Sequence, residues 1–317
     1  MSEFKRPLLD VKNLKQHFKV NKKFTVKAVD GVSFQIKHGE TYGLVGESGS
    51  GKSTIGRSII RLYNPTSGSI VFDGKEMAGK LDKEREDFLR TNMQMIFQDP
   101  MASLNPRKKV IEIITQGLEI QGLYDSTEER VAKGLDTLEQ VGLSREFANR
   151  YPHQFSGGQR QRVGIARALI MNPQLVIADE AISALDVSIQ AQIVNLLKDI
   201  QEDRGLSYLF IAHDLSMVKY ISDRIGVLHQ GYLLETGTKE EIFNNPIHPY
   251  TRSLLSAIPH PNPITEKHRK SLHYSYEGSG FTYSLGEEHQ LTDTHSVWVE
   301  PDKFDKVLNE AMAVPVS

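Results

Sequence analysis

The segment "GESGSGKST", residues 46–54, constrains the fold of this chain more than any other. It follows the apolar run "TYGLV" and contains G-x-x-x-x-G-K-[ST], the pattern of a glycine-rich loop between a strand and a helix. Its glycines let backbone amides turn inward around a phosphate, while Lys52 can reach phosphate oxygens and Ser53 can offer a hydroxyl to Mg²⁺. A simple glycine-rich turn is the alternative, but the full pattern arises by chance in roughly one chain of this length in a hundred. The pattern predicts a phosphate site at the end of a buried strand, with a helix beginning at Ser53.

Polar side chains also end three further apolar runs. These runs are "MQMIFQ" (93–98), "QLVIAD" (174–179) and "SYLFIAH" (207–213). Because ligands collect at the carboxyl ends of parallel strands, Asp179 is expected to hold Mg²⁺ and Glu180 to orient or deprotonate a water. His213 can hydrogen-bond a phosphate, and the Gln98 amide suits a metal, a water or a turn. The alternatives are that the two acids are merely solvated and that the histidine is structural. The neighbouring phosphate loop favours a functional site over both.

A second helix start suited to anions lies in "FSGGQRQR", residues 155–162. The apolar residues from Val163 to Ile170 have helical spacing and are followed by Pro173. Residues 155–158 are therefore expected at a helix N-terminus, where free amides and the helix dipole favour a negative charge. One chain thus carries two separate helix starts suited to phosphate.

The arrangement of apolar runs predicts an α/β protein. Between about residues 40 and 230, short apolar runs alternate with amphipathic helical stretches. The residues before 40 alternate as antiparallel strands do, and residues 106–150 are expected to be helical, with a capping box at 126–129. From residue 244 the chain becomes proline-rich and then polar, which predicts an extension that wraps or decorates a working domain.

Composition excludes several classes of protein. The 317 residues are 39% apolar and 25% charged, and the net charge of −2 argues against a nucleic-acid binder with a basic face. The absence of cysteine excludes disulfides and cysteine-ligated metal sites. The run "YLFIA" is far shorter than the ~20 residues of a membrane span, and "MSEFKRPLLD" lacks the apolar segment of a signal peptide. We therefore expect a protein that stays inside the cell and does not cross a membrane alone.

The order of the motifs resembles the ATP-binding-cassette (ABC) family, the ATPase subunits of ABC transporters. In chain order they are "GESGSGKST", Gln98, "FSGGQ", "LVIADE", "SALD" (183–186) and His213, within about residues 18–235. The resemblance implies a P-loop α/β fold with a central, mainly parallel sheet, an N-terminal antiparallel β subdomain and an inserted helical subdomain at about 100–170. It places the ATPase domain at 1–243 and a C-terminal extension at 244–317.

The resemblance also implies ATP and Mg²⁺ as cofactors and a role for each motif residue. Glu180 would be the general base, His213 would hold the γ-phosphate, and Gln98 would couple the site to a membrane partner. Mg²⁺ would be held by Ser53, Gln98 and Asp179. The "FSGGQ" motif would bind the γ-phosphate of ATP held by a second subunit, and an aromatic side chain would stack on adenine unless it belongs to the core. The residues implied to bind nucleotide are Phe18, Gly46, Glu47, Ser48, Gly49, Ser50, Gly51, Lys52, Ser53, Thr54, Ser156, Gly157, Gly158, Gln159, Asp179 and, bridging the dimer, Asp186.

The tail narrows the resemblance to one subgroup. Together with "QMIFQDPMASLNPR" and "RYPHQFSGGQRQR", the segment "NNPIHPYTRSLLSAIP" (244–259) is similar to the second ATPase subunit of oligopeptide/dipeptide importers. This implies oligopeptide import, with dipeptides, nickel or another substrate of the subgroup as the alternative. The implied partners are a second ATPase subunit in a heterodimer, two membrane-spanning permease subunits and, indirectly, an extracytoplasmic peptide-binding protein, with no nucleic acid. The implied location is peripheral, on the cytoplasmic face of the cell membrane.

One residue departs from the family pattern. Ala181 stands where proline usually follows the catalytic glutamate. Since proline confines the preceding residue to extended geometry, we expect Glu180 to be held less firmly here.

Three rival functions fit the chain less well. A repair or translation ATPase would carry long coiled coils or a second signature, and a P-loop kinase or GTPase leaves "FSGGQ" and "SALD" unexplained. A catalytically inactive partner within a transporter would not need the complete set of lysine and acidic residues.

Overall fold

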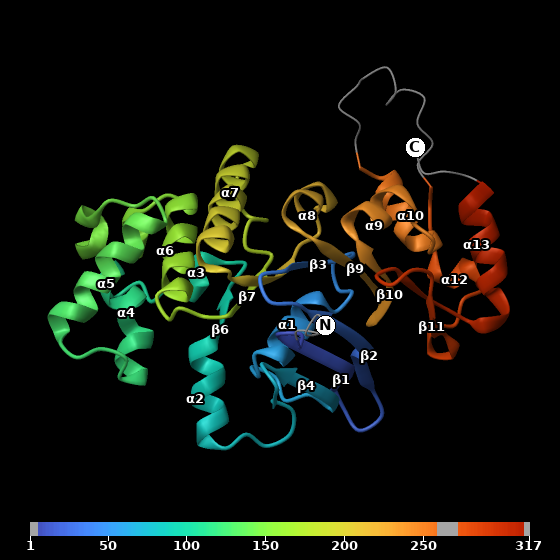
Figure 1. The fold of residues 1–317 in the computed structure, drawn as a ribbon, viewed down its shortest axis with the longest axis horizontal. Helices are drawn as coiled ribbons and strands as arrows, with labels where there is room; N and C mark the ends of the chain where they lie inside the picture. The colour runs from blue at the N-terminus through green and yellow to red at the C-terminus, as the bar shows by residue number, and fades with distance from the viewer. Residues whose placement is uncertain (1–5, 259–271, 314–317) are drawn as a thin grey trace, which may run out of the picture.

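The computed structural model describes residues 6–258 and 272–313. Its centre is an eight-stranded sheet in the order β11-β12-β10-β9-β3-β8-β7-β6 (Figure 1). Neighbouring strands from β9 to β6 are parallel, and β10, β12 and β11 continue the sheet in antiparallel pairs. The parallel strands are β3 (Thr41–Val45), β6 (Met93–Ile96), β7 (Leu175–Asp179), β8 (Ser207–Ile211) and β9 (Arg224–His229). The predicted α/β fold with a mainly parallel sheet is confirmed.

The central strands are covered on both faces. Every residue of β3, β7 and β8 is buried, which explains why these strands have continuous apolar sequences. Along β7, Val176 and Ala178 join the core that includes α7 (Val187–Arg204) and α8 (Leu215–Ile221). Ile177 joins the opposite core, which includes α1 (Lys52–Ile59). This alternation follows the two-residue period of a strand and holds the strand ends between two layers.

The N-terminal strands form a separate antiparallel sheet in the order β2-β1-β4-β5. Its strands are β1 (Leu9–Lys19), β2 (Thr25–Ile36), β4 (Ser67–Phe72) and β5 (Lys75–Glu76). Buried residues of these strands share a core with Ile55 and Ile59 of α1. The phosphate-loop helix is therefore packed between the two sheets.

The segment between β6 and β7 is mainly helical and forms the green region of Figure 1. It contains α3 (Pro100–Ser103), α4 (Val110–Gln121), α5 (Thr127–Gln140), the 3₁₀ turns η1 (Arg145–Asn149) and η2 (Pro152–Gln154), and α6 (Gly157–Leu169), while α2 (Lys83–Asn92) precedes β6. Ser126 is the N-cap of α5, and its hydroxyl accepts from the Glu129 amide at 3.1 Å. The expected capping box is only half formed, because the Glu129 carboxylate accepts from the Asp125 amide at 2.7 Å instead.

The C-terminal extension joins the main sheet. Strand β12 pairs with β10, where Glu235 lies opposite Val297, and β11 pairs with β12. The elements from β10 onward are β10 (Tyr232–Thr238), α9 (Lys239–Asn244), α10 (Pro249–Ser256), α12 (Tyr276–Ser279), η3 (Tyr283–Leu285), β11 (Glu287–Gln290), β12 (Ser296–Val299), η4 (Pro301–Lys303) and α13 (Phe304–Ala313). Tyr250 and Tyr283 are buried in the same core as α7 and α8. Among the described residues, no helix combines the length and apolar character of a membrane span.

Candidate functional site

The phosphate loop follows β3, and α1 begins at Lys52, one residue before the predicted start. Gly51 is the N-cap of α1 and has a φ of 109°. A Cβ at Gly51 would collide with the carbonyl oxygen of Ala28, and one at Gly46 would collide with that of Leu228. Glycine is therefore required at both ends of the loop, because the backbone passes too close to its neighbours for a side chain.

Lys52 lies inside the loop that precedes it. Its ammonium donates to the carbonyl oxygens of Gly46 at 2.8 Å and Glu47 at 2.9 Å, and the residue is only 3% exposed. Burial lowers the pKa of Lys52, and the negative charges of Glu180 and Asp179 oppose that shift. The site therefore holds a desolvated cation next to helix amides, which is an arrangement suited to phosphate oxygens.

Ser53 and Asp179 meet although they lie on different elements. The Ser53 hydroxyl donates to Asp179 Oδ1 at 2.5 Å, and Arg57 Nη2 lies 3.3 Å from Asp179 Oδ2. The Asp179 side chain is 1% exposed. A hydroxyl and a carboxylate are oxygen ligands of the type that Mg²⁺ takes alongside phosphate and water. The donor set therefore fits the predicted Mg²⁺, for which Ser53 and Asp179 would be protein ligands, while Gln98, the third predicted ligand, lies against Glu180.

Glu180 is the second acidic residue of the site and has specific neighbours. Gln98 Nε2 donates to Glu180 Oε2 at 2.8 Å, and His213 Nδ1 lies 3.9 Å from the same oxygen. The Glu180 side chain is 16% exposed, whereas that of His213 is 57% exposed. The three catalytic candidates therefore lie together at the ends of β6, β7 and β8, with Gln98 and Glu180 in direct contact.

The backbone of Glu180 bears on the expectation that this residue is held less firmly without a following proline. Glu180 has a φ of 47°, in the left-handed region, whereas a following proline would favour extended geometry. Its amide donates to the Ile211 carbonyl at 2.9 Å, and its carbonyl accepts from the amide and hydroxyl of Ser183 at 3.1 and 2.9 Å. These bonds to β8 and to the following turn hold a conformation that costs energy in isolation. Glu180 is therefore positioned without a following proline.

The "FSGGQ" segment forms the N-terminus of α6. Ser156 Oγ accepts from the Gln159 amide at 3.3 Å, and Gln159 Oε1 accepts from the Ser156 amide at 3.0 Å. The first-turn amides of Gly157 and Gly158 have no carbonyl within the helix to bind. Ser156 is exposed, and α6 packs mainly on α3, α4, α5, α7 and β6. None of those elements carries the phosphate loop of this chain.

Two further candidates have local partners. The exposed Asp186 is the N-cap of α7, and its carbonyl accepts from the amides of Ile189 and Gln190. The half-buried Phe18 ring packs edge-on against Tyr63, with the ring centroids 5.3 Å apart.

Two residues of the site were missed by the sequence reasoning. Arg57 lies four residues after Ser53 on α1, so helical spacing alone could have placed it on the same face. Tyr250 accepts a hydrogen bond from the Glu47 amide at 3.1 Å across 203 residues of sequence. No local pattern indicates a contact over that separation.

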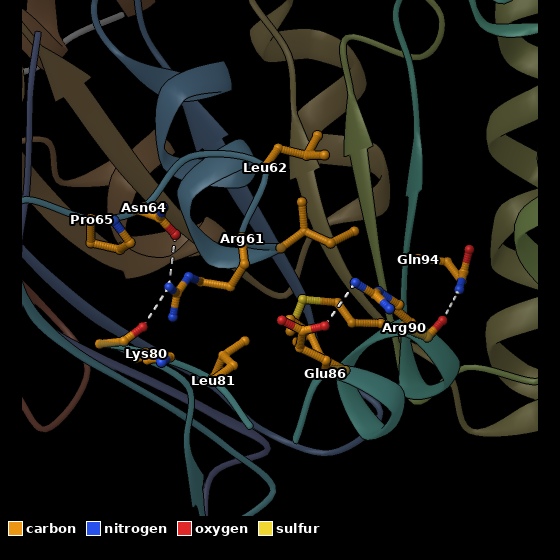
Figure 2. Close-up of a pocket in the computed structure, with 13 residues that line it drawn as sticks. Arg61, Leu62, Asn64, Pro65, Lys80, Leu81, Glu86, Arg90 and Gln94 are labelled. Carbon is orange, nitrogen blue, oxygen red and sulfur yellow. Dashed lines mark hydrogen bonds and ion pairs between the residues drawn. The ribbon is translucent and has the colours of Figure 1, made fainter. Parts of the chain in front are cut away.

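A groove lies at the opposite end of α1 from the phosphate loop, where α1 ends and α2 meets β6. It has a volume of about 780 Å³ and is lined by Leu62, Leu81, Arg90 and Gln94 among others (Figure 2). A second hollow of about 460 Å³ shares Leu62, Arg90 and Gln94 and continues to Phe97 and Ile120. Leu62 is 57% exposed and Ile120 is 70% exposed, so this surface presents apolar side chains to solvent.

Both family models and known proteins match the chain. Residues 29–183 match the ABC transporter family model, and residues 234–277 match the model for the C-terminal region of oligopeptide/dipeptide transporters. The oligopeptide transport ATP-binding protein OppF of Bacillus subtilis (strain 168) is 61% identical over 264 residues, which are 83% of this chain and 86% of that protein. The dipeptide transport ATP-binding protein DppF of Lactococcus lactis subsp. cremoris is 56% identical over 276 residues, 86% of this chain and 88% of that protein.

Solved structures are similar to about three quarters of the chain. One is an ATP-binding cassette dimer in a post-hydrolysis state bound to ADP and Pi, with a TM-score of 0.67 and 32% identity. The match covers 73% of this chain and 98% of that one. Another is cbiO1 of Clostridium perfringens, part of an ABC transporter complex, with a TM-score of 0.66 and 27% identity over 75% of this chain and 90% of that one.

Proposed function

This chain belongs to the ABC transporter family of ATP-binding proteins, and from that membership we propose that it hydrolyses ATP to power the import of oligopeptides. The observation that carries the proposal is the contact between Ser53 of the phosphate loop and Asp179 at the end of β7, with Glu180 next in the chain. This contact supports a site in which a phosphate, the ligands of its metal ion and a general base that activates water lie together.

In this proposal, the phosphate loop binds ATP. Lys52 exchanges its two carbonyl partners for phosphate oxygens, and the amides at the start of α1 donate to the same group. Ser53 and Asp179 hold Mg²⁺, while Arg57 keeps the Asp179 carboxylate in place. When bound, Mg²⁺ neutralises charge on the phosphate oxygens. Phe18 is the candidate for stacking on adenine.

Hydrolysis requires a base near the γ-phosphate. Glu180 is assigned that role because its carboxylate is partly exposed, follows the Mg²⁺ ligand Asp179 and is fixed through its own backbone. Gln98 donates to one Glu180 oxygen, and the carboxylate keeps further lone pairs that can accept a proton from water. His213 is exposed and lies 3.9 Å from Glu180. In this proposal its ring turns toward the γ-phosphate and positions the water that Glu180 deprotonates.

A second ATPase subunit completes each site in this proposal. The first-turn amides of α6 lie away from the Lys52 loop of their own chain, so residues 156–159 are assigned to a nucleotide on a partner. Asp186, exposed at the start of α7, is assigned to the contact between the two subunits. The solved cassette dimer bound to ADP and Pi supports this arrangement. We propose a heterodimer, as the resemblance to the second of two importer subunits implies.

The groove where α1 ends and α2 meets β6, together with the hollow that adjoins it, is the proposed contact with membrane-spanning permease subunits. Leu62, which lines both, and Ile120, which lines the hollow, are exposed and suit an apolar helix from a partner. Phe97 of the hollow directly precedes Gln98, which contacts Glu180, so a partner seated there can influence the base. The chain would then act peripherally on the cytoplasmic face of the membrane, with a peptide-binding protein on the other side.

Dipeptide import is the second candidate, because a relative of 56% identity is named as a dipeptide transport protein. To test the shared function, the tagged full-length chain is purified from membranes with its partners and assayed for hydrolysis of ATP with and without Mg²⁺. We expect Mg²⁺-dependent hydrolysis and recovery of a second ATPase with two permeases. Recovery of repair or ribosomal proteins instead would contradict a transport role. Uptake of a labelled oligopeptide in competition with a dipeptide would show which of the two substrates the transporter carries.

A further inference from the structure

Tyr250 connects the C-terminal extension to the phosphate loop. Its hydroxyl oxygen lies 3.1 Å from the Glu47 amide nitrogen, which donates to it, and the residue is 1% exposed. The amide of Glu47 and the carbonyl of Gly46 belong to one peptide group, and Lys52 donates to that carbonyl at 2.8 Å. Because a peptide group is planar and rigid, Tyr250 and Lys52 hold opposite ends of the same unit.

The position of Tyr250 is set by a buried hydrogen-bond network. Its amide donates to His248 Nδ1 at 3.0 Å, and the amides of Ile247 and His248 donate to the Glu235 carboxylate at 2.8 and 2.9 Å. Glu235 Oε1 also lies 2.8 Å from His295 Nε2, and both side chains are almost fully buried. Glu235 of β10 and His295, the residue before β12, therefore anchor the start of α10, so the tyrosine cannot move freely away from the loop.

The ring of Tyr250 is fixed as well. It packs against the His229 ring at a centroid distance of 4.2 Å, and His229 Nδ1 lies 2.8 Å from the Tyr283 hydroxyl. His229 directly follows Leu228, whose carbonyl lies where a side chain on Gly46 would have to be. Burial raises the pKa of Tyr250, so the hydroxyl stays neutral and remains an acceptor for the loop amide without adding a negative charge beside the phosphate site.

We propose that Tyr250 is a positioning residue that orients the Gly46–Glu47 peptide, so that the C-terminal extension helps to set the affinity of the Lys52 site for ATP. This rests on the proposed function only in that the loop binds ATP. Before ATP binds, Lys52 on the carbonyl and Tyr250 on the amide hold this peptide together, and the tyrosine keeps holding it when Lys52 turns to the phosphate. Without the tyrosine hydroxyl, the loop has to be ordered during binding, and that ordering weakens affinity.

Replacing Tyr250 by phenylalanine removes the oxygen and keeps the ring. Tyr250→Phe should raise the Kd for a fluorescent ATP analogue about three- to tenfold, the range expected for one hydrogen bond. It should raise KM for ATP by a similar factor and leave kcat within about twofold, since the bond orients the loop in the ground state. Amide hydrogen exchange in residues 46–51 should become faster in the variant.

The matched control is Tyr274→Phe, which makes the same chemical change in the same aromatic cluster. The Tyr274 hydroxyl contacts that of Tyr283 at 2.9 Å and does not touch the loop. It should lower thermal stability without changing the Kd for the analogue. An unchanged Kd in Tyr250→Phe, or an equal rise in both variants, would overturn the proposal.

A second variant keeps the test decisive if Tyr250→Phe does not fold. Glu235→Gln weakens the anchor of α10 while leaving the tyrosine in place, and should raise the Kd in the same direction by a smaller factor. No shift in that variant would overturn the proposal. If the wild-type complex fails to bind the analogue at all, the proposed function fails instead, and the two failures are distinguishable.

Discussion

Glu180→Gln gives the sharpest test of the catalytic assignment. Glu180 carries the only carboxylate in contact with Gln98 among the described residues, and the replacement amide can still accept that 2.8 Å hydrogen bond through its oxygen. Backbone bonds to Ile211 and Ser183 hold position 180 and do not involve its side chain. The fold should therefore be preserved, while the ability to take a proton from water is lost.

The size of the effect follows from general base catalysis, which contributes about 10²- to 10⁴-fold to a rate. Turnover should fall by that factor, equivalent to about 3–5 kcal/mol of transition-state stabilisation. Binding should not weaken, because the change removes a negative charge near Lys52, where the charges of ATP will lie. Unhydrolysed ATP should then keep the two subunits together, so an ATP-dependent dimer should accumulate.

The assay measures phosphate release, the Kd for ATP and the mass of the complex in ATP. Glu202→Gln, on the exposed surface of α7, makes the same substitution away from the site and should behave as wild type in all three. Hydrolysis by Glu180→Gln at the wild-type rate would refute the assignment. A loss of ATP binding together with turnover would mean that Glu180 supports the loop and not the reaction.

Three other changes test separate parts of the structure. Ala181→Pro sets the preference of proline for an extended preceding residue against the hydrogen bonds to Ile211 and Ser183 that hold Glu180 left-handed. The Ala181 amide makes no hydrogen bond in the described chain, so we expect those bonds to prevail and ATP turnover to stay within about twofold. A large loss of turnover in a folded variant would refute that expectation. Ser156→Arg should leave nucleotide bound at the Lys52 site of the same chain and abolish vanadate trapping of nucleotide on the partner subunit. Photolabelling each subunit measures this trapping. Trapping lost only in the altered chain would show that Ser156 acts on the nucleotide of its own chain. Burial opposes ionisation of Asp30, yet hydrogen bonds from lysine, tyrosine and histidine side chains hold its pKa at about 2, below the usual 3.8. The lowered pKa stabilises the fold by about 2 kcal/mol above pH 4, and this contribution disappears as the pH falls toward 2. The free energy of unfolding in urea should therefore depend less on acid pH in Asp30→Asn than in the wild type. Identical pH profiles for the two proteins would contradict this.

Local features of the sequence determined the parts of the site that depend on near neighbours. The spacing from Gly46 to Ser53 predicted a strand, a loop and a helix, and the helix start is displaced by one residue only. Ser156 and Gln159 predicted a helix start in the same way, because a side chain can cap amides within three residues of itself. The buried parallel strands were also readable, since both of their faces are apolar.

Tertiary structure decided which distant residues meet. Ser53 reaches Asp179 because β7 and β3 lie on either side of β8, and Gln98 reaches Glu180 because β6 pairs with β7. The motif resemblance predicted these residues to share a site, but their contacts follow from strand order, which no local spacing encodes. The left-handed backbone of Glu180 is likewise imposed by hydrogen bonds to β8 and Ser183.

The C-terminal extension shows most clearly which features follow from local sequence and which follow from tertiary structure. Its proline-rich and polar composition suggested a covering segment, whereas pairing of β12 with β10 makes it part of the sheet. Tyr250 contacts Glu47 only because that pairing, with the buried Glu235 and His295, brings α10 to the phosphate loop. Local sequence sets backbone conformations through sterics and capping within a few residues, and contacts between remote residues exist only once the sheet has formed.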